Sequence, residues 1–130
     1  MSTLKVATIQ DTSGNNSSTP AQVAEGRAKA WANFNGNNTP AFRDDFNFSS
    51  ITDNGTGYYS LNFTSNMSDA NYCTVIGTRS RPAGNVYMQI TTVHAQSTSA
   101  VQITHQQIEG STNNLTMADT DTMHVAIFGD

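Results

Sequence analysis

Charge is what this sequence has least of. Charged residues make up 12% of the chain, about half the share that soluble domains usually carry. Lys and Glu, which helical proteins use heavily, occur only twice each. Asn, Ser and Thr take the place of the missing charge, and this composition is typical of domains made of short strands and turns. We therefore expect an all-β protein.

The sequence also lacks basic clusters, long apolar runs and paired cysteines, and each absence excludes a class of function. The six basic residues are scattered and the net charge is −4, so we expect no nucleic-acid binding. No apolar run approaches the roughly 20 residues that cross a bilayer, and the first residues do not resemble a secretory signal, so we expect no membrane insertion. The single cysteine, Cys73, excludes an internal disulfide, suits the reducing cytosol and is expected to be buried and inert in a strand.

What the sequence does contain is a series of short alternating runs separated by turn residues. In one of them Tyr59, Leu61 and Phe63 are predicted to point inward. In an earlier run Phe42, Phe46 and Phe48 are predicted to share one face. Between these two runs, Asn54, Gly55 and Gly57 are expected to supply the positive φ angles of a hairpin turn. Strands are expected at about 28–35, 41–51, 58–64, 71–77, 86–95, 100–108 and 122–129.

The regular spacing of these runs predicts an antiparallel β-sandwich or jelly roll of seven or eight strands. Residues 4–9 form either a short strand or an extended arm, and the polar residues 10–18 form a loop. Thr19 as N-cap and Pro20 at the first helical position predict a short helix at about 20–26. We therefore divide the chain into an N-terminal arm or linker (1–18) and a single β-sandwich domain (19–130).

Residues that carry catalysis or bind metal occur in no recognisable pattern. His94, His105 and His124 fall on three different predicted strands, and we interpret them as separate, partly exposed, hydrogen-bonded residues. Asp119 and Asp121 resemble a fragment of a calcium loop but lack its Gly and Glu, so turn formation is the preferred interpretation, with a metal left open. No nucleophile elbow and no converging carboxylates are present. We expect no enzyme, no cofactor and no metal site.

Uncharged polar and aromatic residues instead suit adaptable contacts with a protein or a glycan. The candidate contact residues are the apolar residues of the arm, two aromatic residues and two basic residues beside a Pro-Ala-Gly turn. They are Leu4, Val6, Ile9, Trp31, Tyr58, Arg79 and Arg81.

Two stretches resemble a module that recurs in virion proteins of marine tailed phages, including cyanophages. They are GRAKAWANFNG (26–36) and SSITDNGTGYYSLNFTSNMSDANY (49–72). The opening LKVATIQDTSG is similar to the lead sequences of phage fibre and appendage proteins, so the resemblance covers residues 1 to about 75. The sequence departs from the module at Tyr58, Leu61 and Ser68.

The resemblance implies a non-enzymatic virion structural protein, assembled in the host cytoplasm and placed on the exterior of the particle. It would belong to a tail fibre or a receptor-facing appendage, form a homotrimer, and contact other virion proteins and a host-surface glycan or protein. One alternative is a capsid decoration protein that stabilises the head. Another is a glycan-binding, lectin-like module.

Overall fold

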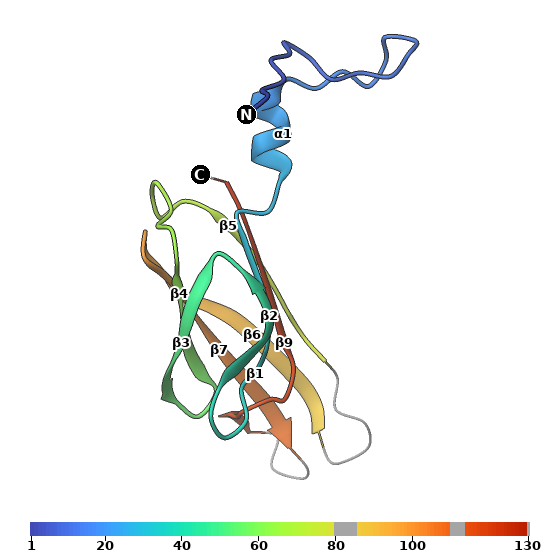
Figure 1. Cartoon of the computed structure of the whole chain (residues 1–130). Helices are drawn as coiled ribbons and strands as arrows, with labels where there is room; N and C mark the ends of the chain where they lie inside the picture. The colour runs from blue at the N-terminus through green and yellow to red at the C-terminus, as the bar shows by residue number, and fades with distance from the viewer. Residues whose placement is uncertain (80–85, 110–113, 130) are drawn as a thin grey trace.

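Two antiparallel sheets form a β-sandwich, and a short helix and an extended N-terminal arm project from one of its ends (Figure 1). The computed structural model describes residues 1–79, 86–109 and 114–129. The architecture confirms the expected all-β sandwich with one short helix. The predicted contact residue Arg81 and the Pro-Ala-Gly turn lie outside the described residues.

One helix and nine strands lie within the described residues. They are α1 (Pro20–Gly26), β1 (Ala30–Asn35), β2 (Ala41–Phe46), β3 (Phe48–Gly55), β4 (Tyr58–Phe63), β5 (Cys73–Thr78), β6 (Val86–Gln96), β7 (Ala100–Glu109), β8 (Leu115–Met117) and β9 (Met123–Phe128).

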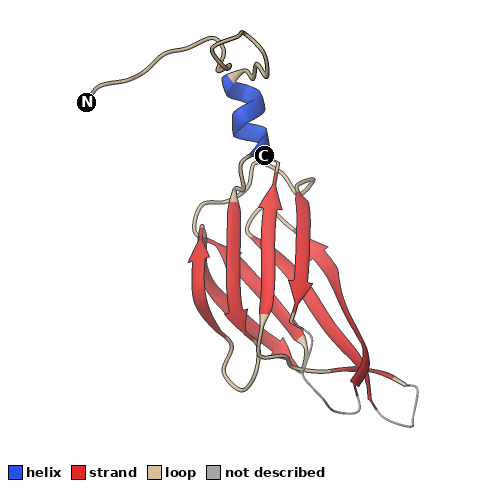
Figure 2. Cartoon of the chain, turned by 90° about the vertical axis from the view of Figure 1, so that its right-hand side faces the viewer, coloured by secondary structure: helices blue, strands red, loops and turns tan. Residues whose placement is uncertain are grey.

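The strand order places the first and last strands of the sandwich in the same sheet. The four-stranded sheet has the order β2-β1-β9-β5, and its outer face is turned toward the viewer in Figure 2. The other sheet has the order β3-β4-β7-β6, with β8 paired to β7. The first and last strands of the sandwich, β1 and β9, therefore lie side by side in the middle of one sheet.

The core consists of the inward residues of the alternating strands. The predicted inward residues Tyr59, Leu61 and Phe63 on β4 are buried. Aromatic rings continue from one sheet to the other, with Phe34 5.5 Å from Tyr59 and Phe48 5.1 Å from Phe63 between ring centroids. Edge-to-face and offset ring pairs of this kind add specific contacts to the area that they bury.

One predicted strand, 41–51, is in fact two strands in different sheets. Asn47 separates β2 from β3 with a φ of 59°, a conformation that Asn tolerates better than most residues. Its side-chain amide donates to the carbonyls of Lys29 and Ser65, both at 3.1 Å, and so fixes the corner. The chain changes sheets here, so Phe48 is buried while Phe46, predicted to share its face, is 52% exposed.

The predicted hairpin lies between β3 and β4, but its turn differs in detail. Gly55 and Gly57 adopt positive φ angles of 131° and 64°, whereas Asn54 does not. The Asn54 side chain instead donates to Ser60 Oγ at 2.7 Å. The expectation of a positive φ at Asn54 was therefore wrong, and Gly55 and Gly57 adopt the positive φ angles of this turn.

Two predictions of burial were also wrong. Cys73, expected in the core, is exposed at the first position of β5. His105, expected to be partly exposed, is fully buried on β7, where its Nδ1 lies 3.1 Å from Thr91 Oγ1. His105 lies on the same face of β7 as the buried Val101 and Ile103, whereas Cys73 lies on the same face of β5 as the exposed Val75.

Candidate interaction surface

The arm and α1 stand off the sandwich. The capping box that begins α1 joins Thr19 and Gln22, whose side-chain Oε1 accepts from the Thr19 amide at 2.8 Å. None of the helix residues is buried. Ahead of the helix, Ile9 and Ser18 exchange two backbone hydrogen bonds of 2.8 Å, which close the loop between them. The arm is therefore anchored at the end of α1 that is farther from the sandwich (Figure 1).

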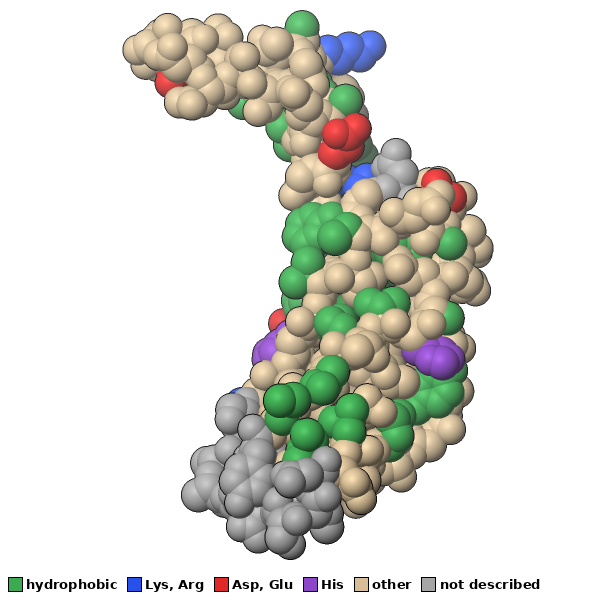
Figure 3. Space-filling model, turned by 180° about the vertical axis from the view of Figure 1, so that it is seen from behind, with side chains coloured by type: hydrophobic (Ala, Val, Ile, Leu, Met, Phe, Trp, Pro, Cys, Tyr) green, Lys and Arg blue, Asp and Glu red, His purple; other side chains and the backbone are tan. Residues whose placement is uncertain are grey.

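A groove of about 410 Å³ runs between the arm and α1, and we call it the arm groove. The predicted contact residues Leu4, Val6 and Ile9 line one side and are 87%, 42% and 53% exposed. Val23 and Ala24 of α1 line the other side. Figure 3 shows hydrophobic side chains along this part of the molecule, beyond the end of the sandwich. The three arm residues thus lie together on one apolar surface.

A second apolar surface crosses the outer face of the four-stranded sheet. The strand register places Phe46, Trp31, Ala126 and Val75 opposite one another on β2, β1, β9 and β5. Directly opposed residues point to the same side of a sheet, so the four side chains are neighbours. Phe46, Trp31 and Val75 are 52%, 38% and 54% exposed. We call these four residues the apolar row.

Sequence reasoning found only Trp31 in this row. Phe46 was predicted to share one face with Phe42 and Phe48, and Val75 was not singled out. The alternation of β1 does carry a signal, because buried Ala30 and Ala32 place Trp31 on the opposite face. Phe46 could not be found in the same way, since its face depends on the corner at Asn47.

Tyr58 lies on a different surface from Trp31. It is half-buried on β4, and its neighbour Tyr59 points into the core, so Tyr58 faces outward from the other sheet. Its hydroxyl donates to Gln102 Oε1 at 2.9 Å. Its ring centroid lies 5.0 Å from that of His94, with the rings inclined at 63°. Tyr58 and His94 form a polar aromatic patch with Gln102, separate from both apolar surfaces.

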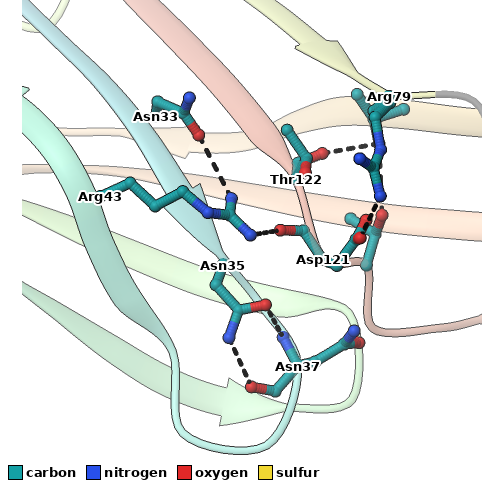
Figure 4. A network of polar contacts seen from close by, with 9 residues as sticks. Asn33, Asn35, Asn37, Arg43, Arg79, Asp121 and Thr122 are labelled. Atoms are coloured by element: carbon teal, nitrogen blue, oxygen red, sulfur yellow. Dashed lines mark hydrogen bonds and ion pairs between the residues drawn. The ribbon is translucent and has the colours of Figure 1, made fainter.

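Arg79 lies at the end of the sandwich that is farther from α1 and is engaged within the chain (Figure 4). Its guanidinium forms an ion pair with the Asp121 carboxylate, and its backbone N–H donates to the carbonyl of Thr122 at 3.3 Å. Arg43 donates to the Asp121 carbonyl and to Asn33 Oδ1. These contacts give Arg79 and Asp121 a structural part in holding the segment before β9.

Asp119 also has an internal part. Its Oδ1 accepts hydrogen bonds of 2.7 Å from the Gly57 amide and from the Tyr59 hydroxyl. Burial, followed by this hydrogen bond, raises the pKa of the Tyr59 hydroxyl. Asp119 therefore ties the β3–β4 turn to the segment before β9.

Within 1–79, 86–109 and 114–129, no group of three or more His, Cys, Asp or Glu side chains is placed to hold a metal ion. His94 and His124 are exposed on the outer faces of different sheets, and His105 is buried between them. The structure thus does not bring the three histidines together. No helix in the described part of the chain has the length and apolar character needed to cross a membrane.

Comparison of the chain with protein-family models, with curated proteins and with solved structures finds no match. The functional argument therefore depends on the geometry of these surfaces and on the resemblance described above.

Proposed function

We propose that this chain is a non-enzymatic structural protein on the exterior of a tailed-phage particle, within a tail fibre or receptor-facing appendage. The observation that carries the proposal is the arm, which exposes Leu4, Val6 and Ile9 while the sandwich buries its own core without it. A folded body with an uncovered apolar arm is suited to attachment, because the arm gains buried area only on binding.

Two further features support an extracellular contact role for the body. Its surface is dominated by uncharged polar side chains, and Tyr58, Gln102 and His94 lie together on one sheet. Aromatic and amide side chains of this kind are suited to hydrogen-bonding contacts with a host-surface glycan or protein. A glycan array probed with the purified chain tests the lectin-like alternative directly.

The arm also suits the capsid decoration alternative, in which it would lie across neighbouring shell proteins. Detection of the chain by mass spectrometry in purified particles, followed by its localisation with antibody-labelled electron microscopy, separates the two sites. Label on the tail or its appendages is expected. Label on the head would favour decoration, and absence of the chain from particles would overturn both.

A further inference from the structure

The sequence contains two Asn-Gly pairs, Asn35–Gly36 and Asn54–Gly55. Both occur where the chain passes from one strand to the next, at the end of the sandwich farther from α1 (Figure 1). An Asn side chain is most open to attack by the backbone nitrogen of the next residue when that residue is Gly, because Gly has no Cβ to hinder the approach. The two pairs differ in how firmly the fold holds that nitrogen.

We propose that Asn54 is a site of spontaneous deamidation in the folded protein, and that the fold protects Asn35 from the same reaction. Water is the other reactant, and the product is a chain with an additional carboxylate on the β3–β4 turn. This modification goes beyond the proposed function and does not depend on it.

The reaction is an intramolecular substitution followed by a hydrolysis. The Gly55 backbone nitrogen bonds to Cγ of Asn54 while the bond from Cγ to Nδ2 breaks, and the displaced proton leaves with Nδ2 as ammonia. Water then opens the resulting cyclic imide. Opening at Cγ gives aspartate, and opening at the main-chain carbonyl gives isoaspartate. The reacting atoms belong to adjacent residues, so the rate depends on whether the backbone can bring them into line.

The Gly55 nitrogen is held within its own turn. Its N–H donates to Asp53 Oδ1 at 2.9 Å, a carboxylate on the same strand. Gly55 has a φ of 131°, and a Cβ built there would meet no atom within 4 Å. Asp53, Asn54 and Gly55 are all exposed. The turn can therefore rotate together with this hydrogen bond, without separating from the rest of the sandwich.

Asn54 is the extra residue of a β-bulge. The register pairs Asp53 with Tyr59 and Gly55 with Tyr58, and it shifts between them, so Asn54 has no opposite residue on β4. A bulged residue disrupts the ladder locally. The Asn54 side chain donates to Ser60 Oγ at 2.7 Å, and this bond breaks when the amide turns toward Gly55. The backbone of Asn54 can thus leave the strand conformation while the flanking pairs remain.

The other pair is held by distant parts of the chain. The buried Gly36 donates its N–H to the carbonyl of Thr120 at 2.9 Å, and a Cβ at Gly36 would lie 2.6 Å from the Tyr59 hydroxyl oxygen. The Asn35 side chain donates to the Asn37 carbonyl at 3.0 Å and accepts from the Asn37 N–H at 3.2 Å. Attack on Asn35 therefore requires the β1–β2 connection to separate from the segment before β9.

Deamidation changes the β3–β4 turn in two ways. A carboxylate at residue 54 cannot donate to Ser60 Oγ, and its charge lies next to that of Asp53. The isoaspartate product routes the backbone through Cβ and Cγ and so lengthens it. Gly57 cannot move to absorb this length, because its N–H is bound to Asp119 and its Cα lies against the backbone of Ala118. The change is confined to the exposed tip of the turn.

Mass spectrometry of the ageing protein tests the proposal. The purified chain is incubated in mildly alkaline buffer, and a parallel sample is incubated in concentrated urea. Peptide fragmentation then gives the deamidated fraction at each Asn over time. In the folded chain we expect Asn54 to react at least about tenfold faster than Asn35, because only Asn35 requires part of the sandwich to open. In urea the two rates are expected to agree within about twofold, since both residues precede Gly and the fold is absent.

Two results would overturn the proposal. One is an Asn35 rate equal to or greater than that of Asn54 in the folded chain. The other is reaction of both residues in urea and of neither in the folded chain, which would mean that the turn protects Asn54 as well.

Anion-exchange chromatography of two variants provides a second test. Asn54→Gln is expected to abolish most of the acidic form that accumulates during incubation, because the longer side chain does not close the same ring. The matched control is Asn62→Gln, on the neighbouring strand and followed by Phe63, which is expected to accumulate the acidic form as the unmodified chain does. An acidic form that persists undiminished in Asn54→Gln would place the reaction at another residue and contradict the proposal.

Discussion

At the residue scale, single positions decide how the two sheets are joined. Gly57 is the clearest of them, because its φ of 64° coincides with close contact to two backbone segments. A Cβ at this position would lie 2.6 Å from the carbonyl oxygen of Ala118 and would also press on that of His105. Backbone atoms cannot move aside as the end of a flexible side chain can.

Gly57→Ala is therefore expected to lower the free energy of unfolding by about 2 kcal/mol or more, through both the clash and the strained φ. Gly77→Ala is the matched control, since a Cβ at Gly77 meets no atom within 4 Å. Urea denaturation of the two variants measures the difference. Equal stability of the two variants would show that the turn can shift without cost.

The raised pKa values of Tyr59 and Tyr72 determine how the free energy of unfolding should depend on pH. Burial, then the hydrogen bond to Asp119, raises the pKa of Tyr59, and burial raises the pKa of Tyr72. The folded chain thus holds these protons to higher pH than the unfolded chain, in which the hydroxyls ionise near pH 10. Their contribution to stability is complete below about pH 10 and is lost as the pH rises above it.

We expect the free energy of unfolding to fall steeply above about pH 10 and to fall less steeply in Tyr59→Phe. At neutral pH this variant is expected to lose about 1–2 kcal/mol, because the hydrogen bonds of the hydroxyl to Asp119 and to the carbonyl of Gly36 disappear. Urea denaturation at a series of pH values measures both effects. An unchanged alkaline slope in the variant would remove Tyr59 as the cause.

At the scale of elements, the alternation of apolar and polar residues correctly predicted the inward side of strands that have a neighbouring strand on both sides. β1, β4, β7 and β9 lie in sheet interiors, and in each of them one set of alternate residues is buried, as the sequence indicates. The prediction failed where a single residue changes the sheet. Nothing in the sequence distinguishes Asn47 from other polar residues. Its side chain nevertheless donates hydrogen bonds to the carbonyls of Lys29 and Ser65, at the corner that divides one expected strand into β2 and β3.

The same limit applies to the interaction surfaces. The apolar residues of the arm, Leu4, Val6 and Ile9, are visible in the sequence because they lie close together along the chain. The apolar row is not visible, since its members are far apart in sequence and meet only through strand register. Register is set by turns, bulges and packing together, and a single strand does not disclose it.

The arm and the sandwich are expected to be energetically independent elements. Deletion of residues 1–18 removes no buried hydrophobic residue. The thermal midpoint of the dilute, monomeric chain is therefore expected to stay within about 2 °C of that of the full chain. Calorimetry or circular dichroism checks this. A fall of about 10 °C would mean that the arm packs on its own sandwich, contrary to Figures 1 and 2.

At the scale of the whole molecule, the two ends of the sandwich are different. One end carries α1 and the arm, and the other carries the segment held by Arg79 and Asp121. Apolar surface is uncovered on the arm and on the apolar row, and Met88, Leu115 and Met117 are exposed on the other sheet. At the far end, Arg79 and Asp121 hold the segment before β9 by polar contacts within the chain (Figure 4). The proposed function therefore assigns attachment to the end that carries the arm.

Incorporation into particles is expected to require the arm and not the far end. Particles are grown with a tagged chain that lacks residues 1–18, in parallel with a tagged Arg79→Ala chain as control, and copies per particle are counted by quantitative mass spectrometry. The arm deletion is expected to reduce incorporation by about tenfold or more, since the apolar area for attachment is lost while the sandwich still folds. Arg79→Ala is expected to be incorporated normally, because its partner Asp121 belongs to the same chain. The reverse result would place the attachment surface at the loops of the far end and leave the arm to contact the host.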